Sequence, residues 1–287
     1  MKPRIPSLVL AFAVFLTGGC AGFPLKKLPV VFEDPATRLG IVSAEPTQSE
    51  KSGIELLMLA PREGKIRSVE EHTLYARIQD GKGLQMKFMM DREDTYKPGS
   101  RDDSYILSSK TILRDQKGSL EEEKEITNRG EIVKFIRGYH DSKIGKFRIT
   151  SWTSSPVLPA GPVKIGASWT YEESMAVRID SFWLKEINPT PYTTKATSIL
   201  TGFALIRGAR CAVIKTLAHE TKREHFKLLF KQVIFDINSS VEETAYLDYA
   251  KGIVLAKVTR IASRTLGINV PLNDTGESQA IFYTLAA

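Results

Sequence analysis

Short runs of alternating apolar and polar residues, separated by glycine-containing turns, most restrict the fold of this 287-residue chain. Between Leu74 and Phe88 two such runs flank a turn that contains Gly81. An odd-numbered loop of three or five residues would pair Ile78 with Leu84 and place both apolar stripes on one face of a sheet. The pattern therefore predicts antiparallel hairpins with one buried face.

Two further segments follow the same pattern. A three-residue loop at residues 128–130, with glycine in the left-handed conformation, would set Ile126 opposite Ile132. A two-residue turn at residues 251–252 would pair Leu247 with Ala256 and leave one dry face. Other strand-like runs occupy residues 54–59, 105–113, 147–152, 168–171, 175–179, 197–205, 211–216 and 279–285. Residues 217–230 suit a helix or a strand, and alternation from Phe226 onward favours a strand.

A proline-rich stretch at residues 155–162 interrupts regular structure and divides the strands into two groups. We expect a mainly β fold with antiparallel hairpins in two β-rich lobes, residues 53–155 and 156–287. The alternative is one large sandwich or open barrel, in which this stretch crosses between sheets. With 42% hydrophobic and 25% charged residues, the composition excludes a disordered or fibrous chain.

The first 19 residues have the organisation of an export signal: a basic start, a short apolar run and small residues. The segment from Leu16 to Cys20 (Leu-Thr-Gly-Gly-Cys) resembles the lipobox of bacterial lipoproteins, with Thr17 where that family most often has leucine. The resemblance implies cleavage before Cys20, a thioether-linked diacyl lipid on its thiol, acylation of the new amine by a palmitate-type chain, and durable membrane anchoring. Ala21 then implies the outer membrane, since aspartate at this position favours inner-membrane retention in the family.

Residues 20–52 contain four prolines, mixed charges and one short apolar patch. This composition predicts an extended tether between the lipid anchor and the folded part. The alternative is a first edge strand at residues 30–32.

The run from Val163 to Trp169 contains a Val-Lys-x-Gly-x-x-Trp pattern. It resembles a motif of uncharacterised β-rich envelope lipoproteins, in which the motif opens a C-terminal β-domain. The resemblance implies a fold and a location without a known activity. From the residues themselves, we expect Gly166 to form a tight turn and Trp169 to anchor the core.

The residues that most resemble catalytic motifs fail on spacing. His219 and His225 are six residues apart, whereas a zinc-protease helix needs histidines four apart. Ser168 lacks the second glycine of a nucleophile elbow, and Cys211 lies in an apolar run that predicts a buried thiol. The other histidines, His72 and His140, stand alone. We therefore expect no catalytic residue, metal or cofactor.

Two acidic clusters are expected in solvated hairpin loops. The first is partly neutralised by basic neighbours, and neither has the spacing of a calcium loop. The clusters comprise Asp91, Glu93, Asp94, Asp102 and Asp103, with Arg92, Lys97 and Arg101 nearby, and Glu121 to Glu123.

These observations predict a lipid-anchored cell-envelope protein, at the outer membrane and facing the periplasm, that acts as a non-catalytic binding or scaffolding module. The expected partners are the membrane and either an envelope protein or an apolar ligand. One alternative is a carrier of lipid or other apolar cargo on a curved sheet, and another is an envelope hydrolase. The formal net charge of +7 comes from scattered residues and does not predict nucleic-acid binding.

Overall fold

The computed structural model describes residues 34–58, 65–77, 83–114, 118–142, 146–180, 184–186, 192–228, 231–269 and 273–286. The predicted signal (residues 1–19), Cys20 and the first part of the predicted tether lie outside the described residues. So does the strand considered at residues 30–32.

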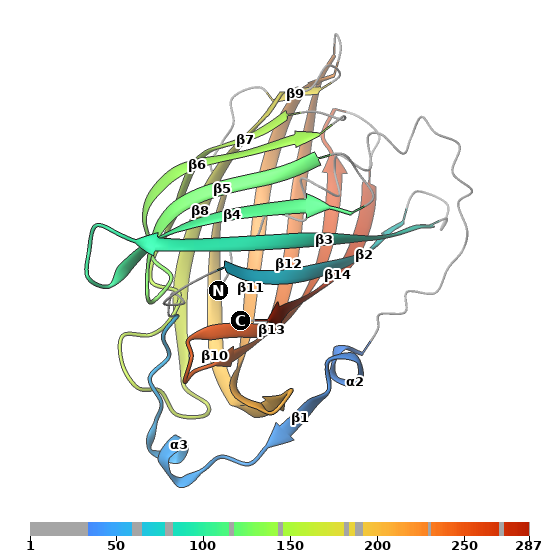
Figure 1. The fold of residues 1–287 in the computed structure, drawn as a ribbon. Helices are drawn as coiled ribbons and strands as arrows, with labels where there is room; N and C mark the ends of the chain where they lie inside the picture. The colour runs from blue at the N-terminus through green and yellow to red at the C-terminus, as the bar shows by residue number, and fades with distance from the viewer. Residues whose placement is uncertain are drawn as a thin grey trace.

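The described strands form a closed antiparallel barrel of twelve strands (Figure 1). Each strand pairs with its neighbours, and the pairings β14–β2 and β8–β10 close the circuit. Of two shorter strands, β1 (Ile41–Ala44) pairs with β10, and β9 (Leu184–Glu186) pairs with β8 and β11. The barrel strands are β2 (Lys65–Arg77), β3 (Gly83–Pro98), β4 (Ser104–Leu113), β5 (Gly118–Thr127), β6 (Ile132–Ser142), β7 (Lys146–Ser154), β8 (Ser168–Asp180), β10 (Tyr192–Ile206), β11 (Ala209–Leu228), β12 (Lys231–Asp248), β13 (Ile253–Gly267) and β14 (Asn273–Ala286).

The mainly β prediction is confirmed, and the strands form a single barrel. Strands from 53–155 and 156–287 pair through β7–β8 and β14–β2, so the two predicted lobes share one sheet. Closure satisfies backbone groups that two separate sheets would leave at their edges. Residues 155–162 contain neither helix nor strand, as their prolines predict.

Two of the predicted hairpins can be compared with the observed strand pairs. Ile126 pairs with Ile132, as predicted, and Gly130 has φ 79°, in the left-handed region. In the hairpin around Gly81, Leu84 pairs with Ala76 and not with Ile78, so that detail of the register is wrong. Arg77 pairs with Gly83, and the predicted loop between them, residues 78–82, lies outside the described residues.

The register predicted for the third hairpin is wrong. Asp248 pairs with Ile253 and Leu247 with Val254, so the turn contains four residues, 249–252, and not two. An irregularity next to Leu247 then shifts the pairing by one residue, so that Ala245 pairs with Lys257. A shift of one residue turns the side chains of a strand to the other face. Lys257 therefore points into the barrel, where a dry apolar face was expected.

Strand β11 shows how inner and outer walls differ. It continues through residues 217–228, so the helical alternative is wrong there. Its inward side chains, from Ala212 to Ala218, are buried. Its outward side chains are exposed and mostly polar: Lys215, Leu217, His219, Thr221, Arg223 and His225. A lipid-facing barrel wall carries an apolar band about 25 Å tall, whereas this strand presents side chains suited to water.

No helix among the described residues is long and apolar enough to cross a membrane.

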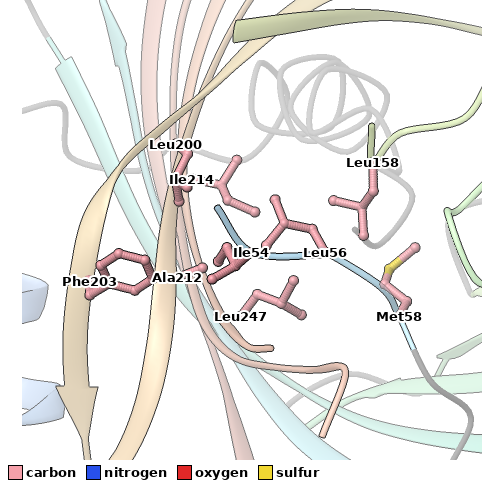
Figure 2. Packing of buried hydrophobic residues seen from close by; sticks show 9 residues of the cluster. All are labelled: Ile54, Leu56, Met58, Leu158, Leu200, Phe203, Ala212, Ile214 and Leu247. Atoms are coloured by element: carbon pink, nitrogen blue, oxygen red, sulfur yellow. The ribbon is translucent and has the colours of Figure 1, made fainter. Parts of the chain in front are cut away.

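An apolar cluster, here named the plug, lies at one end of the barrel. It is formed by residues 54–58 and cluster members from other segments: Leu158, Leu200, Phe203, Ala212, Ile214 and Leu247. Figure 2 shows Leu56 between Leu158 and the strand residues. Ile54 pairs with Val163 through two backbone hydrogen bonds, and the Met58 N–H donates to the Asn128 carbonyl at 2.7 Å. The sequence predicted a strand here; the structure has an isolated bridge at Ile54 followed by irregular chain.

Residues 34–52 form an N-terminal strap at the same end (Figure 1). It contains helix α2 (Pro35–Leu39), strand β1 and helix α3 (Gln48–Ser52). The Asp34 side chain caps α2, while Thr47 and Glu50 form a capping box on α3. This part of the predicted tether is therefore folded against the barrel, because both helices are capped and β1 pairs with β10.

Glu50 fastens the strap. Its carboxylate, only 2% exposed, accepts two bonds from Arg210, each 2.6 Å, and a 2.6 Å bond from the Tyr249 hydroxyl. The Arg210 hydrogen bonds lower the pKa of Glu50 from 4.5 to about 2, despite the opposing effect of burial. The carboxylate therefore stays ionised in the folded protein at moderately acidic pH.

This pKa predicts acid sensitivity. Because the folded-state pKa lies below the ordinary value, the stabilisation is complete above about pH 4.5 and is lost as pH falls through about 2. We expect Glu50→Gln to lower the free energy of unfolding at pH 7 by about 2–3 kcal/mol and to flatten its decline between these pH values. Urea titrations across pH measure both effects. Glu55→Gln is the control, since Glu55 is 54% exposed, and an equal loss in both variants would contradict the role of Glu50.

Candidate functional site

The inner wall of the barrel carries a circuit of charged side chains, here named the charged belt. Each member shares a face with inward neighbours through the strand registers. The belt consists of Glu70, Arg92, Asp94, Glu122, Lys124, Glu173, Glu220, Lys222, Glu224, Glu243 and Lys257. Charged groups inside a barrel lose hydration, so their arrangement must compensate that cost.

Arg92 on β3 is the most highly connected cation of the belt. Its Nε donates to Asp94 Oδ1 at 2.7 Å, and its Nη2 donates to Glu122 Oε1 at 2.8 Å. Nη2 also lies 2.6 Å from Ser109 Oγ, which itself donates to Asp94 Oδ1. Burial alone would lower the pKa of Arg92, but the carboxylates of Asp94 and Glu122 raise it. Arg92 is therefore a permanent cation held by two acids.

Lys124 on β5 has a different environment. Its Nζ lies 3.7 Å from the centroid of the Trp152 ring and 3.6 Å from Glu122 Oε1, but it makes no hydrogen bond. The Trp152 indole N–H donates to Glu173 Oε1 at 2.5 Å. Burial lowers the pKa of Lys124 to about 8, and Glu122 opposes this shift. The cation is thus held by a ring and a neighbouring carboxylate.

The circuit continues around the other strands. Lys257 Nζ lies 3.3 Å from Glu243 Oε2, which also accepts from the Thr259 hydroxyl. Lys222 and Glu224 form another ion pair, and Thr194 donates to Glu220 Oε1 at 2.8 Å. The belt therefore runs from β2 through β13 with charges of both signs.

Two inward side chains of the belt retain accessible surface. The Glu70 side chain points inward beside Phe282, yet 24% of it remains accessible. Lys222, also inward, retains 12%. An inward side chain keeps such exposure only where atoms do not fill the space in front of it. Barrels with more than eight strands commonly enclose ligand cavities or channels.

The carboxylate of Glu70 is ionised although it lies inside the barrel. Burial raises its pKa, but His72, Lys257 and Arg92 lower it, with a net result of about 2. The belt contains seven acidic and four basic side chains by residue type. The described inner wall therefore has an acidic excess, although the whole chain is basic.

The belt contains two acidic residues, and their neighbour Arg92, that were expected in solvated loops. Asp94 is fully buried on β3, and Glu122 is 3% exposed on β5. That prediction is wrong for these residues because β3 and β5 extend through the charged runs, and a strand directs alternate side chains inward. Asp91 and Glu93 have outward registers, so only part of each run is solvated.

The residues considered for catalysis are not brought together. His219 and His225 are exposed on the outer wall, whereas His72 is buried and stacks on Phe88 inside. Cys211 is fully buried, as predicted, with its pKa raised to about 12 by burial. Ser168 begins β8 at an exposed position. The side chain of His140 lies outside the described residues.

Within the described part of the chain, no group of three His, Cys, Asp or Glu side chains has an arrangement that could hold a metal ion.

Gly166 and Trp169 behave as their motif predicts. Gly166 has φ 87° and its N–H donates to the Leu200 carbonyl. Trp169 packs partly buried against the plug, and its indole N–H donates to the Val157 carbonyl at 2.8 Å. The motif thus ties β8 to the plug end of the barrel.

No protein-family model and no curated protein matches the chain. Among solved structures, the chain has a weak similarity to OccK11 (OpdR) of Pseudomonas aeruginosa. The identity is 7% and the TM-score 0.21, with 81% of this chain and 98% of the other covered. A TM-score this low supports neither a shared fold nor a shared function.

Proposed function

We propose that this chain is a lipid-anchored cell-envelope protein whose barrel stands in water and binds a ligand in its interior without catalysis. The polar outward face of β11 carries this proposal. A barrel strand that presents lysine, arginine and histidine outward is poorly suited to a bilayer. Membrane attachment then depends on a separate device, and the lipobox-like segment ending at Cys20 supplies one.

The interior is the better candidate for the binding surface. It has the plug at one end, is accessible beside Glu70, and contains polar groups fixed by rigid strands. Ligand sites are typically concave, with a few polar groups that orient the ligand. A purely apolar cargo is the weaker alternative, because the belt would leave charges facing apolar atoms.

The anchor is tested by fractionation of a bacterial host that expresses the chain. We expect the wild-type protein to stay with membranes through high-salt and carbonate washes and to incorporate labelled palmitate. Cys20→Ser should move to the soluble envelope fraction and lose the label, because the barrel wall has no comparable affinity for lipid. The location, outer membrane facing the periplasm, is tested by separating the two membranes.

Cys211→Ser is the matched control, since this buried cysteine is not a site of acylation in the proposal. It should fractionate and label like the wild type. Retention of Cys20→Ser in carbonate-washed membranes would show that another part of the chain holds the lipid and would refute the proposal.

A further inference from the structure

We propose that the charged belt binds an organic cation, such as a primary amine attached to an apolar group. This inference deepens the proposed function, since it rests on ligand binding inside the barrel and adds the chemical class of the ligand. Four features of the inner wall lead to it.

The first feature is the acidic excess of the belt. Seven carboxylate-bearing residues face four cationic ones, so pairing within the belt leaves acidic side chains in surplus. A positively charged ligand supplies the missing countercharge, and it gains more from these carboxylates inside the protein than in water.

The second feature is an acceptor without a donor. Glu122 Oε1 accepts from Arg92, but Oε2 is buried and has no hydrogen-bond partner. The side chain is only 1% exposed. A buried carboxylate oxygen without a partner is costly, and an ammonium group brings up to three N–H donors to such an acceptor.

The third feature is that each cation of the belt already has a negatively charged neighbour. Arg92 is engaged by two carboxylates, while Lys222 and Lys257 each have a glutamate partner. Lys124 lies over the Trp152 ring with Glu122 at its side. Each belt cation thus has a countercharge, so an anionic ligand would have to displace an existing carboxylate.

The fourth feature is the mixture of acids with apolar inward residues. Met90 is the strand partner of Glu70, and Phe235 is the strand partner of Glu224; both apolar side chains are buried. An amine joined to a hydrocarbon or aromatic group suits such a wall better than a small hydrated cation.

The test compares three probes that share a phenyl group: phenethylamine, phenethyl alcohol and phenylacetate. Calorimetric titration into the mature protein in mild detergent measures their affinities. We expect the amine to bind at least about tenfold more tightly than the alcohol, with no measurable binding of phenylacetate. Higher salt should weaken amine binding, because the attraction is electrostatic.

A pair of variants locates the site. Glu70→Gln removes the accessible inward carboxylate and should weaken amine binding by about tenfold. Glu242→Gln makes the same change at an exposed outward position of β12 and should leave it unchanged. Thermal unfolding of each variant verifies that the barrel is intact, and the wild-type comparison of probes needs no variant.

Equal binding of amine and alcohol, preferred binding of phenylacetate, or no binding of any probe would overturn the cation assignment. If only the alcohol or only phenylacetate bound, the interior would still be a ligand site, but its ligand would not be a cation. If Cys20→Ser stayed with the membranes, the lipid anchor would be refuted, but the measured affinities for the three probes would not change.

Discussion

Replacing Arg92 with methionine is expected to lower the free energy of unfolding by about 3–5 kcal/mol. Methionine fills similar space but leaves the buried carboxylates of Asp94 and Glu122 without their shared cation. Two acids that share a site repel each other and take up protons at higher pH. Urea titration followed by tryptophan fluorescence measures the loss.

Arg67→Met is the matched control. Arg67 lies on the neighbouring strand but is 72% exposed, and its ion pair with Glu93 is at the surface, so the expected change is below about 0.5 kcal/mol. Adding Asp94→Asn and Glu122→Gln to Arg92→Met should restore part of the stability, because the uncompensated charges are removed. A loss below about 1 kcal/mol for Arg92→Met would show that the ion cluster is not a structural element.

Truncation of the plug should have an effect of similar size. Leu56 is fully buried between side chains of β10, β11 and residue 158. Leu56→Ala removes apolar contacts and leaves a cavity, at an expected cost of about 3–5 kcal/mol. We also expect faster exchange of the backbone amides at Ile54 and Met58, which hydrogen-bond the plug to its surroundings.

The same substitution on the outer wall separates burial from residue type. Leu217 is 59% exposed, so Leu217→Ala should change the free energy of unfolding by less than about 0.5 kcal/mol. The plug assignment would be contradicted if the two leucine variants unfolded at the same urea concentration.

The barrel strands are largely predictable because alternation and turn chemistry agree along most of them. The loop before Ile132 is the clearest example, since Gly130 both permits the left-handed conformation and leaves room for the plug. A Cβ added to Gly130 would lie 2.5 Å from Met58 Cε. Closure of the barrel was less predictable, because it depends on pairings between strands that are far apart in sequence.

The charged belt was missed for two physical reasons. A one-residue shift near Leu247 places Lys257 inward, and such irregularities depend on backbone geometry that residue patterns do not specify. Runs of charge were also assigned to loops. Four consecutive charged residues from Asp91 to Asp94 lie within one strand, and alternation requires two of them to face inward.

The folded strap was predictable from local signals. Thr47 and Glu50 have the spacing of a capping box, and Asp34 followed by proline is typical of a helix start. The prolines of this region instead predict an extended chain, and this prediction is wrong for residues 34–52. The burial of Glu50 depends on Arg210 and Tyr249, which no local pattern connects to it.

The seam between β2 and β14 has a consequence for folding. It places Val69 beside Tyr283, so closure of the barrel joins residues more than 200 positions apart in the sequence. Such distant pairings form slowly. The barrel is therefore expected to close late in folding, when β14 pairs with β2.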